Sequence, residues 1–257
     1  IGGINEQPVL DALKKGEQFF VVGSCNGHAT ARKIAILQKV LRSPFVWSRV
    51  RVKSTMLRRS DDRDKEKVNT SFSFIVPDAR YAEEGTYHAY SVKEAFRSLG
   101  QEIRLRTKVG KLTDPYQHCL FWEVKVPGVD WFLRNPKWKE ILRNSLIQEF
   151  GNDPWCAVTS ELQSNIVEEE STRIHNFYLE PWLLGDRPYC HIIVCLPTLD
   201  IYEEDGDIQI EYGTFTPQRS NVIWTNLEMA AMAYDPHQFD AQEFLEITKP
   251  VLEPKEI

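Results

Sequence analysis

The sequence lacks the cysteine pattern of a disulfide framework or a zinc site. Its 257 residues contain five cysteines, an odd number, and no two of them stand at Cys-x-x-Cys spacing. Small disulfide-stabilised secreted domains and zinc ribbons depend on such paired cysteines. The cysteine usage therefore favours reduced thiols in an intracellular compartment, cytoplasmic or nuclear.

Long apolar runs and known phosphate or catalytic motifs are also missing. No apolar stretch approaches the roughly 18 residues of a membrane-spanning helix, so we expect no membrane segment. Because the chain begins with Ile1 rather than Met, an upstream organelle-targeting segment stays open. Neither Gly-x-Gly-x-x-Gly nor a P-loop occurs, and Gly-x-Ser-x-Gly and His-Glu-x-x-His are absent too. These absences favour a function without catalysis, cofactor or metal.

Charge is distributed unevenly along the chain, whose net charge is −6. Residues 1–80 contain 15 basic and 8 acidic residues, a net charge of +7. Residues 81–150 carry +2, whereas residues 151–257 contain 5 basic and 20 acidic residues, a net charge of −15. A basic front and an acidic end predict an anionic partner for the first part and a different task, such as contact with a protein partner, for the second.

Hydrophobic periodicity predicts short alternating elements in residues 1–80. The expected elements are a helix over residues 8–13, a buried strand over 18–23, a helix over 28–42, and strands over 47–57 and 68–76. The charged segment between the last two strands is expected to be an exposed hairpin tip. These two strands are therefore predicted to pair with each other.

Residues 81–257 predict a mixed α/β region of unknown topology. We expect helices over residues 91–99 and 138–150 and within 222–234, and strands over 117–126, 173–179, 189–196 and 207–212. The fold class is therefore α/β (α+β), and we expect two domains, 1–80 and 81–257.

The turn at Gly27 has the chemistry of an anion site. It would open a helix, whose first N–H groups and positive dipole end attract phosphate, and Arg32 and Lys33 follow in the first turns. The next strand carries basic residues that can follow a phosphate backbone, namely Arg49, Arg51 and Lys53. A plain strand-to-helix turn and a solvated strand face are the structural alternatives.

The segment from Pro8 to Val76 resembles the Alba superfamily of chromatin and RNA-binding proteins. Residues 21–33 are similar to the family's strand, basic turn and helix start, and the strands at 50–57 and 68–76 with their charged tip match its long two-stranded arm. The resemblance implies a βαβαββ fold for residues 1–80 and pairing into homo- or hetero-oligomers such as dimers.

The resemblance also implies nucleic-acid contacts from the turn and the arm. Carried over by position, the contacting residues are Asn26, Gly27, His28, Arg32, Arg58, Arg59 and Arg63. Asn26 stands where the family usually has arginine, and Glu6 and Gln7 replace a lysine pair of archaeal members. These departures weaken DNA compaction as the function and favour RNA.

Two weaker patterns leave enzymatic alternatives open. Asp114 followed by Glu123 and Lys125 is similar to the metal-binding carboxylates and lysine of PD-(D/E)xK nucleases. Histidines on or near predicted strands could join a carboxylate around a metal, namely His118, His175 and His191 with Glu180, but core or surface histidines are the simpler interpretation.

The sequence therefore predicts a nucleic-acid-binding protein, with RNA favoured over DNA, that contacts the phosphate backbone and binds a protein partner through its acidic end. The alternatives are a structural subunit of a ribonucleoprotein or other assembly, and a metal-dependent nuclease.

Overall fold

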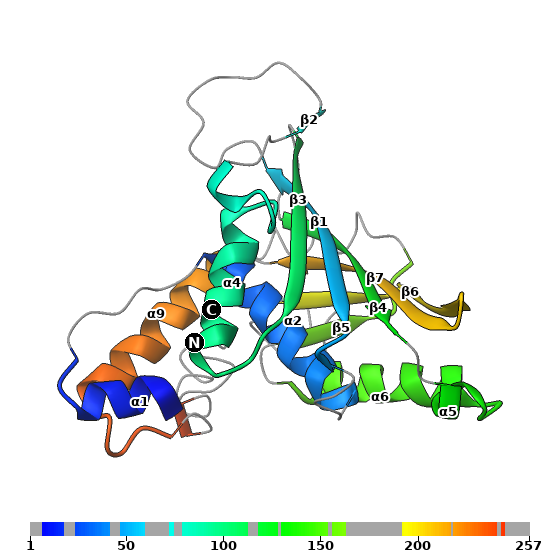
Figure 1. Ribbon diagram of the computed structural model, residues 1–257. Helices are drawn as coiled ribbons and strands as arrows, with labels where there is room; N and C mark the ends of the chain where they lie inside the picture. Colours follow the sequence, from blue (N-terminus) through cyan, green and yellow to red (C-terminus); the bar gives the residue numbers. More distant parts are fainter. Residues whose placement is uncertain are drawn as a thin grey trace, which may run out of the picture.

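A seven-stranded mixed sheet forms the centre of the protein (Figure 1). The computed structural model describes residues 7–17, 24–41, 47–59, 72–74, 79–112, 118–127, 130–153, 156–162, 192–216, 218–240 and 243–244. In spatial order the strands are β2 (Phe72–Phe74), β3 (Arg104–Leu112), β1 (Arg51–Arg59), β4 (His118–Val126), β7 (Asp207–Thr216), β6 (Ile192–Glu204) and β5 (Cys156–Thr159). The mixed α/β class expected from the sequence is confirmed.

Two of the strand pairs are parallel and four are antiparallel. β1 runs parallel to β3 and β5 parallel to β6, whereas the neighbours β2–β3, β1–β4, β4–β7 and β7–β6 are antiparallel. Strands from both sides of residue 80 alternate in this one sheet. The basic front of the chain and the region that follows therefore share a hydrophobic core.

Helices cover one face of the sheet. α2 (Cys25–Leu41), α4 (Tyr87–Ser98) and α6 (Trp138–Asn152) supply buried side chains to the same core as the strands, and Figure 1 shows α2 and α4 beside the strands. The ring of Phe150 in α6 lies 5.6 Å from that of Tyr212 in β7, and Lys33 in α2 lies over the Trp122 ring of β4. The alternate residues of these strands consequently point to the opposite face.

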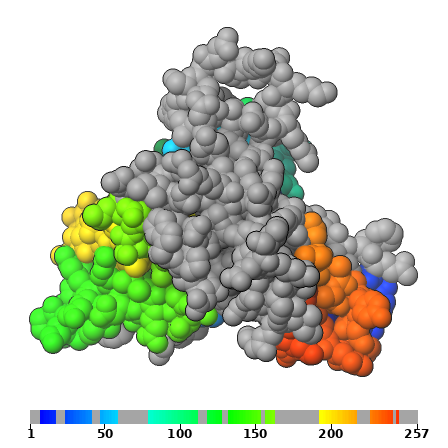
Figure 2. Space-filling view, turned by 180° about the vertical axis from the view of Figure 1, so that it is seen from behind, coloured from blue at the N-terminus to red at the C-terminus, as the bar shows by residue number. Residues whose placement is uncertain are grey.

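Further helices lie at the flanks. α1 (Gln7–Lys14) packs against α9 (Gln218–Tyr234) through Val9, Leu10 and Met232, a small core separate from the main one. α5 (Asp130–Leu133) precedes α6, and a 3-10 turn, η1 (Ala79–Tyr81), precedes α4. From behind, Figure 2 shows the green segment of α5 and α6 and the orange segment of α9 on opposite flanks.

Most predicted elements that fall on described residues are confirmed. The predicted helices over 8–13, 28–42, 91–99, 138–150 and 222–234 correspond to α1, α2, α4, α6 and α9, and the predicted strands over 117–126, 189–196 and 207–212 to β4, β6 and β7. The strands predicted over 18–23 and 173–179 lie outside the described residues.

The predicted pairing of strand 47–57 with strand 68–76 is wrong. β1 has β3 and β4 as its neighbours, and β2, the described part of the second strand, pairs with β3 instead. β3 carries its own alternation of buried and exposed side chains, so it inserts between the two strands and buries its apolar face in the same core. The two-stranded arm implied by the Alba resemblance is therefore not formed by the described residues.

Two buried hydroxyl groups hold the register of β1 against β3. Ser54 and Thr107 lie directly opposite each other, and their side-chain oxygens are 2.9 Å apart. Both residues are buried among apolar neighbours, where a hydroxyl without a partner costs about 1–3 kcal/mol. A shift of one residue would remove this partner and also turn every side chain of β3 to the other face.

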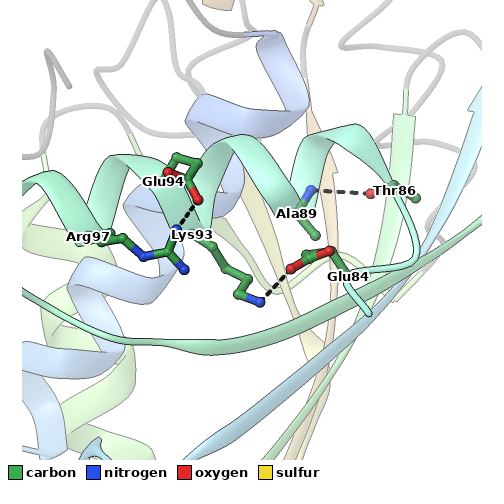
Figure 3. Close-up of polar contacts among 6 residues, drawn as sticks. All are labelled: Glu84, Thr86, Ala89, Lys93, Glu94 and Arg97. Carbon is green, nitrogen blue, oxygen red and sulfur yellow. Dashed lines mark hydrogen bonds and ion pairs between the residues drawn. The ribbon is translucent and has the colours of Figure 1, made fainter. Parts of the chain in front are cut away.

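A tight turn before α4 docks on the outer side of β3 (Figure 3). The Thr107 N–H donates to the carbonyl of Glu84 over 2.8 Å, and the Glu84 carboxylate accepts from Lys93 Nζ at 2.5 Å. This hydrogen bond from Lys93 lowers the pKa of Glu84. Thr86 then caps α4 by accepting from the Ala89 N–H. The start of α4 is therefore tied to the middle of β3.

Glycine is required between Glu84 and Thr86. Gly85 has φ +79°, and a Cβ there would lie 2.3 Å from the backbone oxygen of Thr107. Gly100, after α4, has a similar φ of +72° but no atom within 4 Å of its Cβ position. Substituting Gly100 therefore tests backbone strain alone, whereas substituting Gly85 tests backbone strain together with steric overlap.

Gly100→Ala is expected to lower the free energy of unfolding by about 1 kcal/mol, the usual cost of a left-handed backbone at a residue with a Cβ. Gly85→Ala adds the overlap with Thr107 and is expected to cost about 2–4 kcal/mol. Urea unfolding followed by circular dichroism measures both variants. Equal losses would show that the contact between the turn and β3 is not close.

Candidate nucleic-acid interface

Five exposed basic side chains of β1 and β3 stand on the face of the sheet opposite the helices. In β1, Val52 and Met56 are buried while Arg51 and Lys53 are exposed. In β3, Leu105, Thr107 and Val109 are buried while the residues between them are exposed, namely Arg104, Arg106 and Lys108. We call Arg51, Lys53, Arg104, Arg106 and Lys108 the basic face.

The parallel register brings these cations side by side. Arg51 lies opposite Arg104, and Lys53 lies opposite Arg106, with neighbouring strands about 5 Å apart. Like charges directly opposite each other destabilise a sheet. The members of each pair therefore repel each other electrostatically within the sheet, and a bound anionic ligand would relieve this repulsion.

Among the described residues, the side chains of the basic face form no ion pair with a carboxylate, although Glu123 lies opposite Lys53 on β4. Lys125, which lies opposite Arg51 on β4, differs because its Nζ is 3.0 Å from the Asp207 carboxylate. The uncompensated charge is therefore concentrated on β1 and β3.

The same face becomes acidic across the sheet. Reading from β3 to β6, one row of directly opposed residues is Arg106, Lys53, Glu123, Glu211 and Asp200. The hydroxyl of Tyr202 donates to Glu211 over 2.6 Å, and this bond to a carboxylate raises the pKa of Tyr202 to about 12. The sheet thus presents a basic half and an acidic half on one surface.

At the start of α2, where the sequence predicts an anion site, a side chain of the protein itself accepts from the Gly27 N–H. The Ser24 hydroxyl accepts from the Gly27 N–H over 3.1 Å, which is the usual role of a serine before a helix. Asn26 is 1% exposed and Gly27 is buried. The helix start therefore does not present these groups to an external phosphate.

Arg32 and Lys33, the predicted cations of this anion site, are buried. The Arg32 Nε donates to the Asp153 carboxylate over 2.8 Å. Lys33 has no exposed surface; its Nζ donates to the Thr214 hydroxyl over 2.8 Å and lies 4.4 Å from the Trp122 ring centre. Both side chains are buried in this conformation, which gives no support to their predicted phosphate contacts.

His28 is held in its neutral form. Burial is the largest of the causes that lower the pKa of His28 to about 4, and nearby positive charge, that of Arg32 included, adds to it. A neutral imidazole offers no full positive charge to a phosphate at neutral pH. The predicted charged contact from His28 is therefore not supported.

Of the other residues predicted to contact nucleic acid, some are exposed, one is half-buried, and some lie outside the described residues. Arg49 is exposed in the turn before β1, together with Arg51 and Lys53 within the strand, whereas Arg58 is half-buried. Arg59 ends β1, but its side chain and all of Arg63 lie outside the described residues. Among the described positions of the predicted interface, the exposed cations are thus Arg49, Arg51 and Lys53.

The sequence analysis assigned no contact to residues 104–112, although they supply three of the five cations of the basic face. The signal was present as a strict alternation in which Ile103, Leu105, Thr107 and Val109 are buried between exposed basic residues. That these basic residues lie next to Arg51 and Lys53 follows only from the parallel pairing.

The enzymatic patterns gain no geometric support among the described residues. Glu123 is exposed on β4, and Lys125 is paired with Asp207, while Asp114 lies outside the described residues. His118 is buried, and His175, Glu180 and His191 also fall outside. In the described ranges no group of three or more His, Cys, Asp or Glu side chains could hold a metal ion.

The comparisons with known proteins identify no relative. None of the protein-family models matches the chain, and no curated protein matches it. Among the helices that the structure describes, none is both long and apolar enough to cross a membrane.

The buried Lys33 makes a prediction for stability against pH. Burial lowers its pKa from 10.5 to about 7. Between these pH values the unfolded chain holds a proton that the folded chain lacks, so stability rises with pH across this window. Relative to Lys33→Met, the wild type is expected to gain about 2 kcal/mol from pH 7.5 to 9.5.

Urea unfolding of the wild type and of Lys33→Met at both pH values measures this gain in stability. The contributions of other titrating groups cancel, because both proteins contain them. Lys39→Met, at an exposed position of the same helix, is the matched control and is expected to follow the wild type. Parallel stability curves for the wild type and Lys33→Met would show that Lys33 keeps an ordinary pKa.

Proposed function

We propose that the protein binds nucleic acid, with RNA favoured over DNA, by contacting the phosphate backbone with the basic face of β1 and β3. The observation that carries this proposal is a set of five exposed cations on two adjacent strands, held in register and without an ion pair among the described residues. Lysine and arginine in such an array bind phosphates and release condensed counterions, which gives salt-dependent affinity with little sequence preference.

The proposal keeps the predicted function and changes the site. The helix start at Gly27 is replaced by β3, while Arg51 and Lys53 stay from the original prediction. An Alba-like relationship of residues 1–80 remains a prediction, and the proposed binding does not depend on it, because the basic face combines strands from both sides of residue 80.

Removal of three charges from β3 tests the proposal. The variant Arg104→Gln, Arg106→Gln, Lys108→Gln is expected to weaken RNA binding by about tenfold or more at 0.1 M salt. The slope of log affinity against log salt is expected to fall in magnitude by about 2, since each single-strand phosphate contact contributes about 0.7. Fluorescence anisotropy across a salt series measures both quantities.

The matched control removes three exposed charges elsewhere, with the variant Lys14→Gln, Arg134→Gln, Lys137→Gln. It changes the net charge by the same amount. Because its three charges do not belong to the basic face, it is expected to bind RNA almost as tightly as the wild type does. If the two triple variants lose affinity equally, general electrostatic attraction accounts for binding and the basic face has no special role.

The acidic half of the sheet favours a second candidate function, that of an assembly subunit with a basic protein partner. The β6–β7 hairpin exposes Asp200, Glu203, Glu204 and Asp205. Light scattering tests whether the protein is self-sufficient: an obligate subunit is expected to associate nonspecifically alone and to become a single species with its partner. A stable monodisperse protein that binds RNA by itself would contradict this second function.

A further inference from the structure

Phe121 is an exposed aromatic ring at the border of the basic face. It lies on β4, is 50% exposed and points to the same side of the sheet as the five cations. Its directly opposed neighbours are Thr55 on β1 and Gly213 on β7. Neither is large enough to cover a phenyl ring.

Internal packing does not account for this exposure. A phenylalanine beside a glycine in a sheet often covers the bare backbone, but the space above Gly213 is occupied by Thr198, whose hydroxyl would lie 3.2 Å from an added Cβ. The Gly213 N–H also donates to this hydroxyl over 2.7 Å. Phe121 therefore keeps half of its surface exposed beside Thr55, and no aromatic ring among the described residues packs against it.

We infer that the ligand of the basic face is single-stranded RNA, one base of which stacks on the ring of Phe121 while its phosphates lie over β1 and β3. This inference rests on the proposed function. Aromatic rings beside a cationic track are the usual means of binding unpaired bases. A duplex keeps its bases stacked inside and offers no such face to Phe121.

The order of charges across the sheet sets the orientation of the strand. Lys108 lies two strands from Phe121, about 10 Å away, and Lys53 lies diagonally next to it. Glu123 stands one position further along the same face of β4, opposite Lys53. Phosphates are attracted to β1 and β3 and repelled by this carboxylate, so the sugar and base lie over β4.

Glu123 also distinguishes RNA from DNA on chemical grounds. An exposed carboxylate accepts hydrogen bonds but donates none. Over β4 it meets the sugar of the bound strand, and the ribose 2′-hydroxyl supplies a donor that deoxyribose lacks. Glu123 therefore tolerates a ribose strand better than a deoxyribose strand.

The test compares Phe121→Leu with the wild type on a fluorescein-labelled 12-nucleotide RNA of mixed sequence, the same RNA as a duplex, and the corresponding single-stranded DNA. Phe121→Leu is expected to weaken single-strand RNA binding by about 5- to 100-fold, the usual effect of removing one stacking ring. The salt slope is expected to stay unchanged, since no phosphate contact is removed.

Two further variants control the interpretation. Phe121→Trp restores a stacking surface and is expected to bind at least as tightly as the wild type, with tryptophan fluorescence quenched as RNA is added. Tyr234→Leu removes a 92% exposed aromatic residue at the end of α9 and is expected to leave RNA affinity unchanged. Both positions are exposed, so the variants are expected to fold.

The outcomes separate this inference from the proposed function. If Phe121→Leu binds single-stranded RNA as the wild type does, while the triple variant on β3 loses affinity, stacking is overturned and the proposed function stands. If the triple variant also binds normally, the proposed function itself fails. Duplex RNA or single-stranded DNA bound as tightly as single-stranded RNA overturns the assignment of the ligand.

Discussion

The parallel pairing of β1 with β3 is the constraint on which the rest of the structure depends. The two strands are about 50 residues apart in sequence, and the buried hydroxyl pair of Ser54 and Thr107 holds them in one register. The turn at Glu84 and Gly85 contacts Thr107 from the other side of β3. Because side chains alternate along a strand, this one register decides that all five cations of the basic face point away from the helices.

The protein uses its positive charges in two opposite ways. Arg32 and Lys33 are taken into the core, where an ion pair with Asp153 and a hydrogen bond to Thr214 compensate for the loss of water. Removing one partner of such a buried pair is costly, so these side chains are committed to the fold. The cations of the basic face keep their hydration and have no carboxylate partner among the described residues, so their charge stays available to a ligand.

Local patterns predicted the helices and several strands because each depends on the periodicity of its own residues. Ile34 and Leu37 are spaced three residues apart, so a helix places them on one face, and Trp122 and Val124 are spaced two apart, so a strand does the same. The neighbour of β1 was predicted incorrectly, because the residue spacing within β1 does not say which strand pairs with it. The short span to residues 68–76 suggested a hairpin, whereas β3 pairs with β1 and separates it from β2.

The sequence by itself determined that basic residues are concentrated in the first part of the chain, that acidic ones follow, and that Arg51 and Lys53 share a strand face. Only the tertiary structure decided which cations are available. Lys33 and Lys53 have the same chemistry, yet one has no exposed surface and the other is exposed. The physical reason is that burial depends on contacts between residues distant in sequence, here α2 with β4 and β7, which the local order of amino acids does not specify.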